Sequence, residues 1–398
     1  MNRFPVWLVC LILFIILLGG AFFVLPKDSY TATPRSVQTA LPFATVEPFT
    51  EASPSLEITD LPPAVSEDIF SSTPTPELEG LQSEEPAAAE VTISEVEEEL
   101  PTLHAHHFID GVCETCGKKL DFYLQSLPEE LFEEAEHRGT VTRYEYTCPA
   151  YGGSGEYHKC INIYTPYDYD PAKHYNVLVL IHGGDGDENS WLTDVYPYNE
   201  HELSGVQLLD RMFELGYCDP CLVVCPVMET EELVGVEPGM IQMRDELRQD
   251  ILPWVAENYS TWAADGSLES LQAAREHFAL GGLSNGALFV WYGGLSYNFD
   301  LFGSYMPLSG VSDSWQALAA IRSDEWIDLP IVCFFTGAGD NGSDWNYNGV
   351  YNGYYTLLNG DSRFVEGQNS FRVDIRAGHD WRVWFTDLCN ALPLMFYS

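Results

Sequence analysis

The chain has 398 residues, of which 46% are hydrophobic and 13% aromatic, so it holds enough apolar side chains for a packed core. Its 60 acidic and 18 basic residues give a formal net charge of −42. A charge of this sign opposes binding to a phosphate backbone, which excludes nucleic acid as an expected partner.

The N-terminal segment is one long apolar run. No charged residue lies between Phe4 and Leu25, and a helix of this length spans the roughly 30 Å hydrocarbon core of a bilayer. A cleaved signal peptide ends its shorter apolar run at a small-x-small site, and no clean site of this kind follows Gly19 and Gly20. We therefore expect residues 1–26 to be a signal anchor, with the rest of a single-pass cell-membrane protein outside. The alternative is a cleaved signal peptide and a secreted protein.

Residues 27–102 are rich in Pro, Thr, Ser and Glu and contain few large apolar residues. Such a composition cannot bury enough surface to offset the entropy lost when the chain is ordered. We expect a disordered, extended linker that holds the following residues away from the membrane.

A short segment rich in cysteine and histidine follows at 103–120. Thiolate sulfur and imidazole nitrogen suit tetrahedral zinc. The four candidate ligands are His104, His106, Cys113 and Cys116. The segment resembles small zinc knuckles, although His104 stands where that pattern has its first cysteine, and His107 is a rival ligand. A zinc held by four protein ligands would be structural; an exposed disulfide or a free dithiol is the alternative.

From residue 127 to 398 the pattern is that of one globular domain. The segment 139–166 predicts a β-hairpin, in which Cys148 and Cys160 are candidates for a disulfide in an oxidising compartment. Four continuously apolar runs follow, separated by segments with helical spacing, and they begin at Asn176, Cys221, His277 and Leu329. Such runs are typical of parallel strands covered on both faces, so we predict an α/β fold with a mostly parallel central sheet.

The pentapeptide GLSNG at 282–286 lies between one of these runs and a segment compatible with a helix. This strand–turn–helix context is that of a nucleophile elbow. A serine hydroxyl needs a base to remove its proton. His379 is the one histidine that follows Ser284 in the sequence, and the chain order in α/β-hydrolases is serine, acid, histidine. We predict Ser284 as the nucleophile and His379 as the base.

The acid and the oxyanion hole follow from the same sheet edge. Asp340 comes directly after the last apolar run, so we predict it as the acid. Its rivals are Asp344, Asp313 and Asp380. The backbone N–H groups of Asn285 and Gly184 are predicted to bind the oxyanion. His182, two residues before Gly184, is expected to be structural.

With these residues in place, the chain from about Gly139 onward resembles the feruloyl esterase/acetyl xylan esterase group, the esterase D-like branch of the α/β-hydrolases. The matching stretches, in family order, are YNVLVLIHGGDGDENSW, MRDELRQDILPWVAENYST, AAREHFALGGLSNGALFVWYGGL, FGSYMPLSG and AGHDWRVWFTDLCNALP. The family's nucleophile falls on Ser284, its base on His379, and its acid on Asp340 ahead of the rivals. Family elbows often have Met after the serine and a second glycine at the end, where this chain has Asn285 and Ala287.

The resemblance implies an α/β-hydrolase fold and a serine esterase that needs no cofactor. Its substrates would be feruloyl or acetyl esters of plant cell-wall polysaccharides such as xylan, or small esters. The loop around Trp345 and Tyr347 is expected to form a rim that faces sugars or aromatic rings. Two alternatives stay open: another ester hydrolase or an acyltransferase on this fold, and a non-catalytic surface binding module with a vestigial triad.

Overall fold

The computed structural model describes residues 108–109, 112–113 and 124–396. The predicted signal anchor at 1–26 and the linker at 27–102 lie outside these residues, and so do the candidate zinc ligands His104, His106 and Cys116. Two short strands, β1 (Phe108–Ile109) and β2 (Val112–Cys113), pair antiparallel in the segment predicted to bind zinc. Within the described residues, no helix combines the length and the apolarity that a membrane crossing requires.

The centre of the domain predicted for residues 127–398 is an eight-stranded sheet in the order β12-β11-β10-β9-β5-β8-β4-β3. Its strands are β3 (Thr140–Pro149), β4 (Glu156–Thr165), β5 (Val177–Ile181), β8 (Leu222–Pro226), β9 (Phe278–Leu283), β10 (Ser304–Leu308), β11 (Cys333–Thr336) and β12 (Ser370–Arg372). The β3–β4 hairpin joins the sheet antiparallel at one end, and all strands from β8 to β12 in this order run parallel. The predicted mostly parallel sheet is confirmed.

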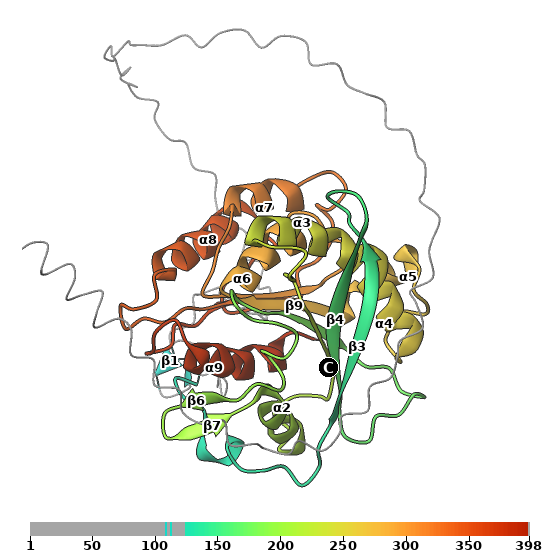
Figure 1. Ribbon diagram of the computed structural model, residues 1–398. Coiled ribbons are helices and arrows are strands. Elements are labelled where there is room, and N and C mark those ends of the chain that lie inside the picture. The colour runs from blue at the N-terminus through green and yellow to red at the C-terminus, as the bar shows by residue number, and fades with distance from the viewer. Residues whose placement is uncertain (1–107, 110–111, 114–123, 397–398) are drawn as a thin grey trace, which may run out of the picture. The chain divides into compact units, whose positions relative to one another are not determined.

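Helices cover both faces of this sheet (Figure 1). They are α2 (Gly205–Glu214), α3 (Val236–Glu246), α4 (Leu252–Asn258), α5 (Leu268–Ala273), α6 (Asn285–Phe289), α7 (Ser314–Ile321), α8 (Tyr347–Gly360) and α9 (Trp381–Ala391). Figure 1 shows α3, α7 and α8 above the sheet and α2 and α9 below it. All five residues of β5 are buried, and they alternate between the two cores: Val177 packs into the upper one and Leu178 into the lower one. The period of two is the reason that a covered strand is continuously apolar.

The hairpin register separates Cys148 and Cys160, the two candidates for a disulfide. Cys148 pairs with Tyr157, and Cys160 pairs with Glu145. Because Tyr157 lies three positions before Cys160, the two cysteine side chains point to opposite faces of the sheet. Both are free thiols. The disulfide between Cys148 and Cys160 is therefore wrong for this fold.

Residues 124–138 form a strap that ties the lower helices to a small hairpin of β6 (Tyr196–Tyr198) and β7 (His201–Leu203). Leu124 exchanges two hydrogen bonds with the side chain of Asn390 in α9, at 2.7 and 3.0 Å. The hydroxyl of Tyr198 in β6 accepts from the backbone N–H of Leu127 at 2.8 Å. The strap thus holds the hairpin and α9 in one arrangement.

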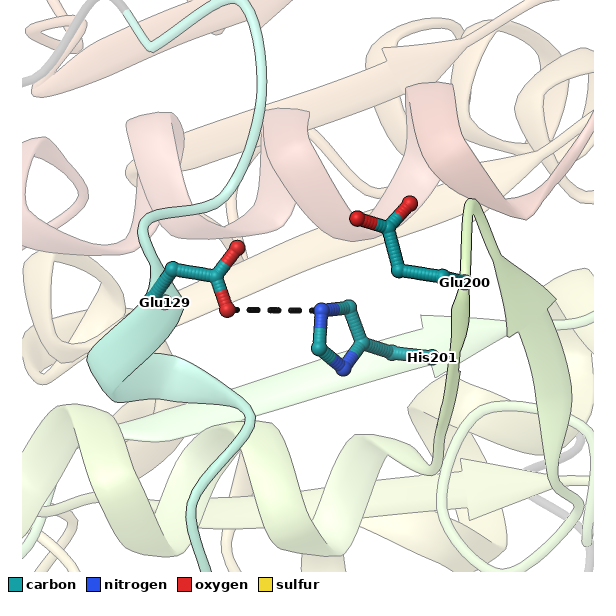
Figure 2. Close-up of side chains that lie close together, drawn as sticks. All are labelled: Glu129, Glu200 and His201. Carbon is teal, nitrogen blue, oxygen red and sulfur yellow. Dashed lines mark ion pairs between the residues drawn. The ribbon is translucent and has the colours of Figure 1, made fainter.

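A surface contact completes this strap. Figure 2 shows Glu129, in the short helical turn η1 (Glu129–Leu131), facing His201 of β7, whose Nε2 lies 3.4 Å from the carboxylate. The ring of His201 also stacks on Phe132 at 4.0 Å. Glu200 lies beside them and makes a group that has the ligand types of a metal site. Both carboxylates are exposed, and we assign this group a structural role only.

A fully buried carboxyl group lies beneath the end of β11. A Cβ atom added to Gly337 would lie 2.3 Å from Oδ2 of Asp387 in α9. Within the described part of the chain, neither carboxyl oxygen of Asp387 has a hydrogen-bond partner. Burial, followed by the charge of the neighbouring Asp374, raises the pKa of Asp387 well above its usual range. The neutral acid is the form that this position favours.

We expect the substitution Asp387→Asn to stabilise the protein progressively as the pH rises above about 4. In the unfolded chain the aspartate ionises near that pH, whereas the folded chain keeps its proton until the raised pKa is reached. The wild type therefore loses stability as the pH rises through this window, and the asparagine variant does not. Thermal unfolding of both proteins between acid and neutral pH measures the difference in Tm, and a difference independent of pH would contradict the expectation.

Candidate active site

Ser284 lies at a sharp turn between β9 and α6. Its backbone angles are φ 53° and ψ −114°, a combination that residues other than glycine rarely adopt. A Cβ atom on Gly282 would lie 2.5 Å from the backbone of Gly286, and one on Gly286 would lie 2.3 Å from the carbonyl oxygen of Ile181. Only glycines fit at these two positions. The turn has the form expected of a nucleophile elbow, with the serine at its apex.

The structure brings Ser284 and His379 together although they lie 95 positions apart. The hydroxyl of Ser284 donates to Nε2 of His379 at 3.0 Å. On the other side of the ring, Nδ1 of His379 donates to Oδ1 of Asp344 at 3.1 Å. The three side chains form a continuous hydrogen-bonded row, which allows the histidine to take a proton from the serine while the carboxylate fixes the ring.

Asp344 is held as a buried carboxylate. Its side chain is fully buried, and its two oxygens accept from the backbone N–H groups of Gly339 and Asn346 at 3.1 and 3.0 Å. Burial acts to raise the pKa of Asp344, but hydrogen bonds from His379, Ser309 and these backbone groups outweigh it and lower the pKa. A carboxylate stabilised in this way stays charged beside the imidazole.

The prediction of Asp340 as the acid is wrong, because the carboxylate that contacts His379 belongs to Asp344. The backbone N–H of Asp340 donates to the carbonyl oxygen of Ile375, so the residue continues the ladder at the end of the sheet, and its side chain is exposed. The chain then turns through Gly342, whose φ is 85°, and returns at Asp344. The carboxylate that reaches His379 is therefore four positions later than the strand end suggests.

The other two rival carboxylates have capping roles. Asp313 accepts from the backbone N–H groups of Trp315 and Gln316 at the start of α7. Asp380 accepts from the backbone N–H of Arg382 at the start of α9 and forms an ion pair with its guanidinium group at 2.7 Å. Within the described residues, neither carboxylate forms a hydrogen bond or an ion pair with the imidazole of His379, and both serve instead as helix N-caps.

The two residues predicted for the oxyanion hole lie next to each other beside Ser284. Asn285 is the first residue of α6, and a Cβ atom on Gly184 would lie 3.0 Å from the Asn285 side chain. His182 supports this loop: its Nδ1 donates to the carbonyl oxygen of Gly183 at 2.7 Å, and its Nε2 accepts from the backbone N–H of Met228 at 2.8 Å. Burial lowers the pKa of His182. With both nitrogens engaged, His182 has the structural place expected of it.

A pocket of about 510 Å³ opens over Ser284 and His379. One wall is aromatic, and its rings are those of Tyr196, Trp345, Trp381 and Trp384. Trp345 lies 4.0 Å from the ring of His379, and Tyr196 stacks on Trp381 at 3.9 Å. Aspartates at 185, 187 and 194 line another part of the pocket. The pocket thus suits a flat aromatic group and disfavours an anion.

The rim expected around Trp345 and Tyr347 is present in part. Trp345 lines the pocket, whereas the hydroxyl of Tyr347 accepts from Arg372 at 3.2 Å. Two further pocket residues, Trp381 and Trp384, were not predicted from the sequence; they lie three positions apart and so share a helix face. Their signal was present in the run HDWRVW, which places two tryptophans in the first turn after His379.

A serine on a nucleophile elbow, joined to a histidine and a buried aspartate at the carboxyl edge of a mostly parallel sheet, defines the class of α/β-hydrolases. No family model matches the chain. Over 281 residues, 68% of its length, it is 32% identical to endo-1,4-beta-xylanase Y of Acetivibrio thermocellus. It spans only 24% of the length of that relative.

Solved structures agree on the fold. A serine-to-alanine mutant of the feruloyl esterase module from Clostridium thermocellum, complexed with sinapinate, matches with a TM-score of 0.57 and 24% identity, over 68% of this chain and 93% of the module. A ferulic acid esterase from Anaeromyces mucronatus, in complex with ferulic acid, matches with a TM-score of 0.51 and 17% identity, over 68% and 96%. The chain is thus an α/β-hydrolase, similar in sequence to the xylanase relative and in fold to solved feruloyl esterases.

The substitution Asp344→Asn is expected to lower kcat/KM for a small ester by about a thousandfold to ten-thousandfold, because the amide no longer holds the imidazole in the required tautomer. Asp340→Asn is the matched control, since it removes a carboxylate from the same loop that does not contact His379. It should keep activity within about twofold of the wild type. Steady-state kinetics on both variants decides between them, and a larger loss for Asp340→Asn would reverse the assignment.

Proposed function

We propose that this protein hydrolyses hydroxycinnamoyl esters, such as feruloyl esters, carried by plant cell-wall polysaccharide. The observation that supports this most is the aromatic-walled pocket directly over the hydrogen-bonded row of Ser284, His379 and Asp344. A planar aromatic acyl group fits such a wall through ring contacts. The solved relatives complexed with sinapinate and ferulic acid support the same acyl class.

The proposed reaction has two steps. As His379 Nε2 takes the proton of Ser284, Oγ attacks the ester carbonyl carbon, and the carbonyl oxygen becomes an oxyanion between the N–H groups of Gly184 and Asn285. The tetrahedral intermediate collapses, His379 gives the proton to the departing sugar oxygen, and the acyl group stays on Ser284. Water then gives a proton to His379 while it attacks the acyl carbonyl, and Ser284 Oγ leaves with that proton.

The acidic part of the pocket supports an ester hydrolase rather than a carboxylate-binding site. Side chains at 185, 187 and 194 line the same space as Ser284. The ester substrate is neutral at its acyl end, whereas the released acid is ionised at neutral pH. Like charges in a partly enclosed pocket repel each other. The product is therefore expected to leave more readily than the substrate.

A panel of esters tests the proposed activity. Methyl ferulate is expected to be cleaved with kcat/KM at least about tenfold above that of acetyl, long-chain acyl or peptide substrates. Ser284→Ala should lose more than about a thousandfold of this activity, and a fluorophosphonate should label the wild type alone. Preference for a different acyl group would indicate another esterase. Transfer of the acyl group to a sugar hydroxyl would indicate an acyltransferase. An unlabelled wild type without hydrolysis would indicate a binding module with a vestigial triad.

Trp345→Ala tests the aromatic wall. Loss of one ring contact is expected to lower kcat/KM for methyl ferulate by about threefold to tenfold relative to that for an acetyl ester. Trp315→Ala is the matched control, because Trp315 is also exposed but does not line the pocket. An equal loss on both esters would mean that Trp345 acts through the ring of His379 and not on the acyl group.

We also propose that the catalytic domain is held outside the cell membrane by residues 1–26, through the linker at 27–102. The long uncharged run and the composition of the linker support this arrangement. Fractionation of cells that express the full chain tests this arrangement, and a wholly soluble mature product would contradict it.

We further propose a structural zinc in the segment 103–120, and the metal content of the purified full chain tests this proposal.

A further inference from the structure

A second hollow lies at the amino ends of the parallel strands, whereas the active site lies at their carboxyl ends. It encloses about 390 Å³, within the size range of ligand sites. Tyr175 and Asn176, which line it, come directly before β5, whose other end leads into the loop of Gly184. The strand between them separates the two sites by about 20 Å. The hollow is therefore distinct from the pocket over Ser284.

Two half-exposed aromatic side chains stand at this hollow. Tyr167 is 50% exposed and Trp262 is 48% exposed. Each ring is stacked on a histidine: Tyr167 on His137, with ring centroids 4.5 Å apart, and Trp262 on His277, at 4.2 Å. The stacking orders the rings before any ligand arrives, which lowers the entropy cost of binding. Exposed aromatic side chains around a hollow indicate a binding surface.

Hydrogen-bonding groups surround the two rings. Asp168, Lys173 and Asp219 line the hollow. Across the part of the chain that the structure covers, no hydrogen bond or ion pair engages these three side chains, so they offer both acceptors and a donor. Asn176 uses its amide oxygen on His277 at 2.9 Å and has its amide N–H₂ group besides. Aromatic rings with interspersed polar groups match the apolar faces and hydroxyl edges of sugar rings.

The hollow continues past Tyr167. A smaller hollow of about 180 Å³ shares Tyr167 and Pro220 with the first and extends along His137 and Phe213. Tyr167 therefore stands between two adjoining depressions, which suits several consecutive sugar units more than one small molecule. The net charge of −42 disfavours polyanions.

We propose that this surface, which we call the Trp262 surface, is a second binding site for a neutral polysaccharide chain, with sugar rings packed on Trp262 and Tyr167. The polysaccharide class rests on the proposed function, because a xylan-type main chain is neutral and carries the esters. A second attachment point raises the effective concentration of the polymer at the active site without contacting the reacting ester. It therefore affects polymeric substrates and leaves small esters unchanged.

Binding of the full-length protein to ester-free neutral arabinoxylan tests the proposal, measured as retardation in native gels that contain the polymer. All proteins carry Ser284→Ala. The double substitution Trp262→Ala with Tyr167→Ala is expected to weaken binding by at least about tenfold, and each single substitution by less. Trp315→Ala, in which the lost tryptophan is exposed in α7, should bind as the parent does.

Kinetics with intact Ser284 separates this proposal from the proposed function. The double variant should keep kcat/KM for methyl ferulate within about twofold, which also shows that it folds, and should lose at least about threefold on a feruloylated polymer. Arabinoxylan binding that is absent in the parent, or equal in the double variant, overturns the Trp262 surface even if ester hydrolysis is found. Binding that depends on Trp262 supports it even if no ester is cleaved.

Discussion

Close backbone contact at the carboxyl end of β9 is the constraint on which the active site depends. Gly282 and Gly286 face each other and the end of β5 at distances that leave no room for a Cβ atom. Packing this tight forces Ser284 into a left-handed backbone conformation. The strain is held by two flanking elements that are buried and fixed. The position of the Ser284 hydroxyl is therefore fixed by the turn, and the rest of the fold positions His379 beside it.

The second half of the site is assembled by loops. His379 and Asp344 follow different strands, and the bonds of Asp344 to Gly339 and Asn346 fix its carboxylate without help from the histidine. Because the carboxylate is stabilised by the backbone, the row of three side chains is set before substrate binds. Preorganisation of this kind avoids rearrangement during the reaction. The first turn of α9, which begins two residues after His379, also carries Trp381 and Trp384 of the aromatic wall.

The sequence predicted those features that depend on neighbours along the chain. Continuous apolar runs identified the strands β5, β8, β9 and β11, because each is covered on both faces, but they did not identify β10. Chain order identified Ser284 and His379. The prediction of Asp340 in place of Asp344 is wrong because sequence shows where a strand run ends but not how the next loop turns at Gly342. Pairing of Cys148 with Cys160 failed for a similar reason, since hairpin register is fixed by the geometry of its turn. Properties set by loop conformation exceed what local pattern can specify.

The strand β5 connects these local features into one arrangement. Its carboxyl end supports the elbow and the glycine loop of the active site, and its amino end borders the Trp262 surface. All five of its residues are buried, so it is a rigid spacer rather than a hinge. A polymer bound at the Trp262 surface can therefore reach the active site only by passing around the outside of the domain. A long, flexible polysaccharide can do this, whereas a short oligosaccharide cannot.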